Sequence, residues 1–218
     1  MTEEAASVRQ RGRTPRAAAI AGIIFALLLI TSHSLIWISV PSNPMGPAVD
    51  VIDRSQTISL ALNLLPFAGI AFLWFIGVLR DRFGEREDRF FATVFLGSGV
   101  LYISMVFIAA AVAGGILRVL GTGSRELIQS GAYALGRVEV NETMHIYAAK
   151  MAGVFMISTS TIARQTRIVP AWMAFLGYAL AVIALLSIGT IEWISLVFPL
   201  WVLLISSYIL IDNLHGAA

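Results

Sequence analysis

The sequence has no cysteine among its 218 residues, and only 13% of them are charged. The absence of cysteine excludes structural disulfides, thiolate metal ligands and cysteine nucleophiles. A soluble domain carries more charge, about 25% of its residues, whereas 58% of this chain is hydrophobic and its mean hydropathy is +0.83. The composition therefore indicates a membrane protein.

Lysine is almost absent, since Lys150 is the only one beside fourteen arginines. This bias is typical of a GC-rich bacterial genome. The net charge of +2 does not indicate nucleic-acid binding, because the excess of arginine in cytoplasmic loops of a membrane protein explains it. We expect the partners to be the lipid bilayer and either a second copy of the chain or another membrane protein.

Six apolar runs of about 20 residues or more alternate with polar segments, and each can cross a hydrocarbon core of about 30 Å as a helix. The sequence therefore predicts an all-α bundle within residues 17–212. The six expected transmembrane helices are 17–40, 57–79, 90–117, 143–163, 170–189 and 193–211. We expect a disordered tail over 1–16, a loop over 118–142 on the outer side, and a short tail over 213–218.

A charged hinge at residues 80–89 separates the second and third runs, and eight of its ten residues are charged. It cannot lie in hydrocarbon, where one Asp or Arg at a helix centre costs about 2.5–3.5 kcal/mol. Ten arginines lie on the side of the N-terminal tail, the hinge and the fourth-to-fifth turn, and four on the other side. The positive-inside rule then predicts cytoplasmic termini in a bacterial inner membrane.

The hinge stretch GVLRDRFGER, residues 77–86, resembles the cytoplasmic motif between the second and third helices of the major facilitator superfamily. The resemblance implies that Asp81, Arg82 and Arg86 form a cytoplasmic latch that contacts neighbouring helix ends. Two of its ten positions depart from the pattern, and a simple positive-inside loop is the alternative interpretation. The whole chain also resembles uncharacterised six-helix membrane proteins of high-GC Gram-positive bacteria, which implies no activity.

Three polar side chains fall in one layer of the predicted spans, each about 10 Å from the outer end of its helix at 1.5 Å per residue. They are His33, Asn63 and Lys150. Pro66 and Pro199 lie at a similar depth and interrupt the backbone hydrogen-bond ladder there. One hypothesis is that the three side chains line a polar pocket open to the outside. The alternative is that each is satisfied locally, with the lysine reaching the headgroups.

Motifs for catalysis are missing from the sequence. Glu142 and His145 stand one helical turn apart, but a carboxylate-bridged metal site needs a second such pair. We therefore expect no catalytic residue, cofactor or metal, and predict a non-enzymatic accessory or interaction subunit. The alternative is a small-solute transporter or half-transporter that works as a dimer, with the polar pocket as its site.

Overall fold

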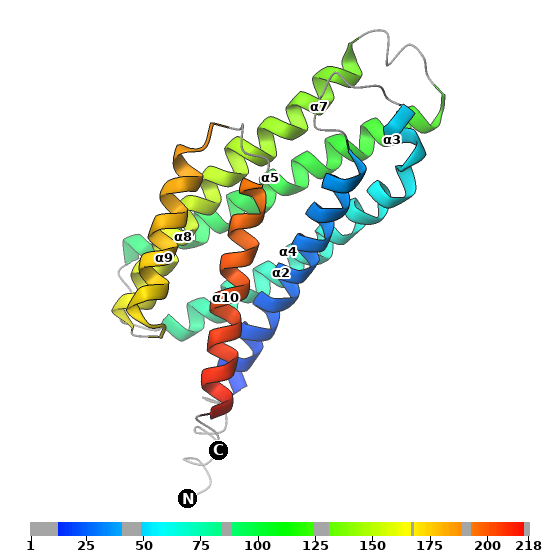
Figure 1. Cartoon of the computed structure of the whole chain (residues 1–218). Helices are drawn as coiled ribbons and strands as arrows, with labels where there is room; N and C mark the ends of the chain where they lie inside the picture. The colour runs from blue at the N-terminus through cyan, green and yellow to red at the C-terminus, as the bar shows by residue number, and fades with distance from the viewer. Residues whose placement is uncertain are drawn as a thin grey trace, which may run out of the picture.

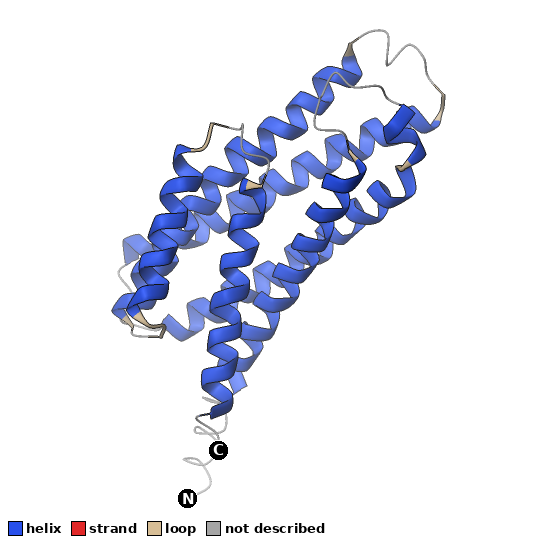
Figure 2. Cartoon of the chain, in the orientation of Figure 1, coloured by secondary structure: helices blue, strands red, loops and turns tan. Residues whose placement is uncertain are grey.

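The computed structural model of the chain describes residues 13–40, 49–83, 89–123, 131–166, 168–188 and 193–215. Every regular element in these residues is a helix, as Figures 1 and 2 show. In chain order they are α2 (Arg13–Ser39), α3 (Val49–Asp53), α4 (Ser55–Phe83), α5 (Arg89–Gly121), α7 (Ala132–Glu142), the π-helix η2 (Thr143–Ala148), α8 (Ala149–Gln165), α9 (Ala171–Leu186) and α10 (Ile194–His215).

Within the described residues, five helical segments are long and apolar enough to cross a membrane. They are Ala19–Ser39, Ser55–Arg80, Phe90–Gly121, Ala132–Gln165 and Ile194–His215. The helix α9 is also apolar, but its 16 residues extend over about 24 Å at 1.5 Å per residue, less than the hydrocarbon core. These features are those of a helical membrane protein.

The expected loop over 118–142 differs most from the structure. α5 continues to Gly121, and α7, η2 and α8 form one segment of 34 residues from Ala132 to Gln165. Such a segment is about 51 Å long, well beyond a hydrocarbon core of about 30 Å. Its first turns therefore need no apolar surface facing lipid, which is why the sequence there has the composition of a loop.

Several smaller differences concern the ends of helices. α2 begins at Arg13, inside the segment expected to be a tail, and α4 continues into the charged hinge as far as Phe83. Asp81 and Arg82 thus belong to the last turn of α4, while their side chains and Arg86 lie outside the described residues. The proposed cytoplasmic latch therefore stays a prediction.

The helices pack as two groups of three. α2 lies along α4 and α10, whereas α8 lies along α9 and α5, and Figure 1 shows the first residues of α2 and the last of α10 at the same end of the bundle. Close approach within the first group depends on Gly22, where a Cβ atom would overlap Ser206 Oγ and lie 2.8 Å from the Phe75 ring.

An aromatic cluster fills the core where the two groups meet. Phe198 of α10 is its centre, with ring centroids 5.7 Å from Phe72 of α4, 4.6 Å from Tyr102 of α5 and 5.5 Å from Phe155 of α8. Phe25 of α2 also belongs to the cluster, with its ring centroid 4.5 Å from that of Phe72, so five helices contribute to it. All these rings are at most 3% exposed, so this section of the bundle is densely packed and apolar.

Candidate functional site

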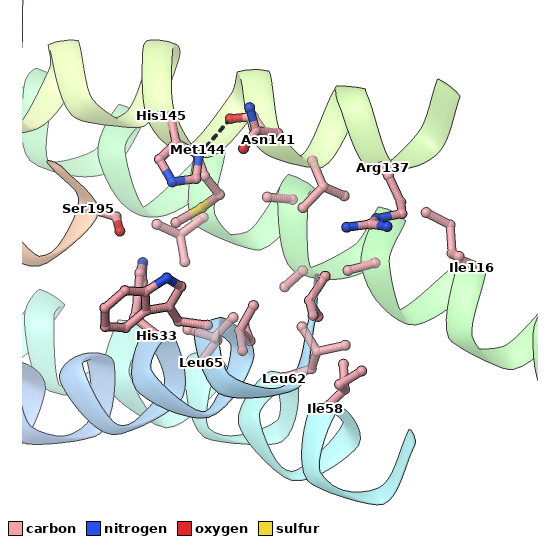
Figure 3. Close-up of a pocket in the computed structure, with 18 of the residues that line it drawn as sticks. His33, Ile58, Leu62, Leu65, Ile116, Arg137, Asn141, Met144, His145 and Ser195 are labelled. Atoms are coloured by element: carbon pink, nitrogen blue, oxygen red, sulfur yellow. Dashed lines mark hydrogen bonds between the residues drawn. The ribbon is translucent and has the colours of Figure 1, made fainter. Parts of the chain in front are cut away.

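A cavity of about 230 Å³ lies in the half of the bundle where α2 ends and α10 begins. Its walls come from α2, α3, α4, α5, α7, η2 and α10 and are mostly aliphatic. The polar side chains that line it include His33, Arg137, Asn141, His145 and Ser195, which Figure 3 shows around the space. An apolar cavity with a few convergent polar groups has the composition of a small-molecule binding site.

The aromatic cluster lies next to the inner end of the cavity. On α2, His33 lines the cavity and Phe25 belongs to the cluster eight residues earlier, which is about 12 Å along the helix. On α10, Ser195 lines the cavity and Phe198 is the centre of the cluster. On α4 the lining residues up to Leu65 precede Phe72, and on α5 Tyr102 precedes the lining residues that begin at Val106. The cavity therefore ends against packed rings.

Two exposed indoles line the cavity. Trp37 is 64% exposed and Trp193 is 56% exposed. Tryptophan is enriched at the boundary between hydrocarbon and headgroups, where its ring is solvated on one side only. Arg54, between α3 and α4, donates a hydrogen bond to the carbonyl of Ile38 near the end of α2, which ties the end of α2 to the start of α4.

His33 is held in place by bonds within α2 and between α2 and α4. The neighbouring Ser32 is fully buried and its hydroxyl donates to the carbonyl of Ala61 in α4 at 2.8 Å. The Nδ1 atom of His33 lies 2.9 Å from the carbonyl of Leu29. Its Nε2 atom is buried and has no hydrogen-bond partner in the described part of the chain.

His145 approaches the same region from the opposite wall. It belongs to η2, and its Nδ1 atom lies 3.0 Å from the carbonyl of Asn141. Figure 3 shows His145 and His33 extending toward one another, with Met144 beside them. Single π-helical segments inside α-helices are frequent at functional sites, and this one provides two consecutive side chains, Met144 and His145, that both line the cavity.

Arg137 lies at the other end of the polar face. With Asn141 and His145 it forms a series at four-residue spacing along α7 and η2, so the three side chains share one face of the helix. Its guanidinium donates to the Tyr133 hydroxyl at 3.4 Å and lies 5.7 Å from the centroid of that ring. Eight residues separate it from His145, about 12 Å along the helix axis.

Two prolines lie inside helices that line the cavity. A proline has no N–H, so the carbonyl four residues before it lacks its normal intrahelical donor. Pro66 of α4 thereby affects Leu62, and Pro199 of α10 affects Ser195. Leu62 and Ser195 both line the cavity.

The structure does not bring together the three side chains expected to form a pocket. His33 lines the cavity, but Asn63 is exposed and its amide donates to the carbonyl of Ser59 on its own helix at 2.9 Å. Asn63 lies outside because Ala61, Leu65 and the other apolar residues of α4 occupy its inner face. Lys150 is partly exposed and is not part of the cavity lining.

The sequence alone did not predict Arg137, Asn141 and Ser195 as site residues, and it suggested His145 only as a metal ligand. The signal available was the four-residue spacing of Arg137, Asn141 and His145 leading into the fourth apolar run. That spacing becomes informative only if the segment is a helix, whereas we expected a loop.

No group of three or more His, Cys, Asp or Glu side chains in the described ranges is placed to hold a metal ion. Asp and Glu are likewise absent from the described residues that line the cavity. Comparison of the chain with protein-family models, with curated proteins and with solved structures found no match in any of the three.

Proposed function

We propose that this chain is a non-catalytic, multi-pass membrane protein that holds a small amphiphilic molecule in the cavity beside α2, η2 and α10. In this proposal it acts as an accessory or interaction subunit of the membrane. The observation that carries the proposal is the cavity itself, which is mostly aliphatic, has polar groups on one helix face, and ends against the aromatic cluster.

The composition of the walls favours an amphiphile over a fully polar solute. Burying apolar surface stabilises a complex by about 25 cal/mol per Å², and most of this lining is aliphatic. A polar solute would leave its own groups unpaired against residues such as Leu62, Leu65 and Val106. The two exposed tryptophans of the lining favour entry from the headgroup region, where amphiphiles are concentrated.

We also propose that α9 crosses the membrane as a sixth span, with both termini in the cytoplasm of a bacterium. The support is the arginine asymmetry, ten on the side of the termini against four on the other. The first residues of α2 and the last residues of α10 lie at the same end of the bundle (Figure 1). This arrangement is consistent with an even number of crossings. In this orientation the cavity opens toward the outer face.

A small-solute transporter or half-transporter is the second candidate. Pro66 and Pro199 favour it, because interrupted helices at a binding site are typical of transporters, and both prolines affect residues of the cavity lining. Against it stands the aromatic cluster, which occupies the section that a transport path would have to cross. The packed cluster favours the accessory protein.

Photolabelling tests the proposed function. A dodecanol that carries a diazirine is bound to the purified protein in nanodiscs, and the labelled residues are mapped by mass spectrometry. We expect labelling at Met144 and His145 in addition to lipid-facing positions. Ala113→Phe fills the cavity, so it should remove this labelling.

Ala111→Phe is the matched control, because Ala111 is exposed on the same helix and does not line the cavity. This variant should keep the labelling at Met144 and His145. Labelling confined to lipid-facing residues in the unmodified protein would refute the proposed function.

A further inference from the structure

We infer that the inner end of the cavity selects a neutral hydroxyl head group, which donates its hydrogen bond to one Nε2 atom of the imidazole pair of His33 and His145. This inference rests on the proposed function and specifies the chemical class of its ligand. It follows from the hydrogen bonds of the two rings and from the position of the one formal charge among the described lining residues.

The hydrogen bonds of the two imidazoles determine where their protons lie. Nδ1 of His33 faces the carbonyl of Leu29 at 2.9 Å, and Nδ1 of His145 faces the carbonyl of Asn141 at 3.0 Å. A carbonyl oxygen only accepts hydrogen bonds, so each Nδ1 must carry the proton. In a neutral imidazole the other nitrogen, Nε2, is then an acceptor with a lone pair.

Both Nε2 atoms are directed to the cavity. Figure 3 shows the two rings extending toward each other from α2 and η2, and Nε2 of His33 is buried without a partner among the described residues. A buried acceptor without a donor is unfavourable. Two facing acceptors cannot satisfy one another, because neither holds a proton on that side. A ligand O–H group has one proton, so it donates to one of the two Nε2 atoms, and the buried Nε2 of His33 is the one that gains most from it.

The position of Arg137 excludes the charged alternatives at this end. Among the described lining residues it is the only one of formal charge, and about 12 Å of helix separates it from His145. A carboxylate or phosphate would place its charge beside the guanidinium, away from the imidazoles. An ammonium would find no carboxylate among the described lining residues and would be repelled by Arg137. A neutral alcohol remains.

Competition binding tests the inference with three ligands of equal chain length. Dodecanol, its methyl ether and dodecanoate each displace the diazirine probe from the purified protein in nanodiscs. We expect dodecanol to bind about tenfold more tightly than the ether, the factor that corresponds to about 1.4 kcal/mol. Dodecanoate should bind less tightly than dodecanol. Since this comparison uses the unmodified protein, it does not depend on whether a variant folds.

Variants then locate the preference. The double variant His33→Leu/His145→Leu, which removes both Nε2 acceptors, should reduce the ratio between alcohol and ether to near one. His215→Leu should preserve it, because His215 makes the same Nδ1 bond to a carbonyl four residues earlier but is exposed and outside the cavity. Equal binding of alcohol and ether, or tighter binding of dodecanoate, would overturn the inference and leave the proposed function intact. If none of the three displaces the probe, both fail.

Discussion

Phe198→Ala tests whether the aromatic cluster closes the inner end of the cavity. The Phe198 ring is 2% exposed and has partners on all sides. Its ring centroid lies 4.6 to 6.4 Å from those of Phe25, Phe72, Tyr102, Phe155 and Trp201. Truncation removes these contacts and leaves a void that the surrounding helices cannot close completely.

The size of the effect follows from packing. Phe→Ala in the core of a soluble protein costs about 3–5 kcal/mol. In a bilayer the lower end of that range applies, because lipid chains are as apolar as the core and only packing is lost. We therefore expect Phe198→Ala to lower the free energy of unfolding by about 3 kcal/mol. Thermal or denaturing-detergent titration of the purified protein measures the change.

Phe67→Ala is the control for this prediction, since Phe67 is 63% exposed on α4 and faces away from the cluster. It should change the unfolding free energy by no more than about 0.5 kcal/mol. Equal losses in the two variants, or no loss in Phe198→Ala, would refute the interpretation of the cluster as a tightly packed closure.

Two further predictions concern packing and orientation. Gly22→Ala should destabilise the protein by about 1–3 kcal/mol because its Cβ would overlap Ser206, whereas Gly77→Ala, with nothing within 4 Å, should not. Because the chain has no cysteine, Gly84→Cys and Gly121→Cys can be labelled singly with an impermeant maleimide in intact cells. We expect labelling of the Gly121→Cys variant only, and the reverse result would invert the proposed orientation.

The apolar runs predicted most of the helices because hydrocarbon imposes a continuous apolar stretch on any helix that crosses it. The same physics explains the failure between residues 118 and 142. Residues beyond the hydrocarbon, or facing a cavity, are released from that requirement, so Gly136 and Asn141 belong to a helix without an apolar signature. Packing against other helices, and not the apolar pattern, therefore decides how far a helix continues beyond the roughly 20 residues that cross the hydrocarbon.

The site was only partly predictable for a related reason. His33 was singled out because an ionisable residue within a span is costly and rare. Its counterpart His145 comes from a π-helical segment, and nothing in the sequence TMHIYA (143–148) marks that geometry. Asn63 lies at the expected depth, but its side-chain amide donates a hydrogen bond to a carbonyl of its own helix and does not enter the cavity. Depth along a helix was predictable, and the direction of the side chain was not.

Side-specific labelling at Ser195→Cys tests the central claim most directly. Ser195 lines the cavity next to the aromatic cluster, and the chain has no other cysteine. A cavity that ends against packed rings predicts labelling by an impermeant maleimide from the outer face only, and protection by dodecanol. Labelling from the cytoplasmic face, or from both faces, would contradict it and favour a transport path through the bundle.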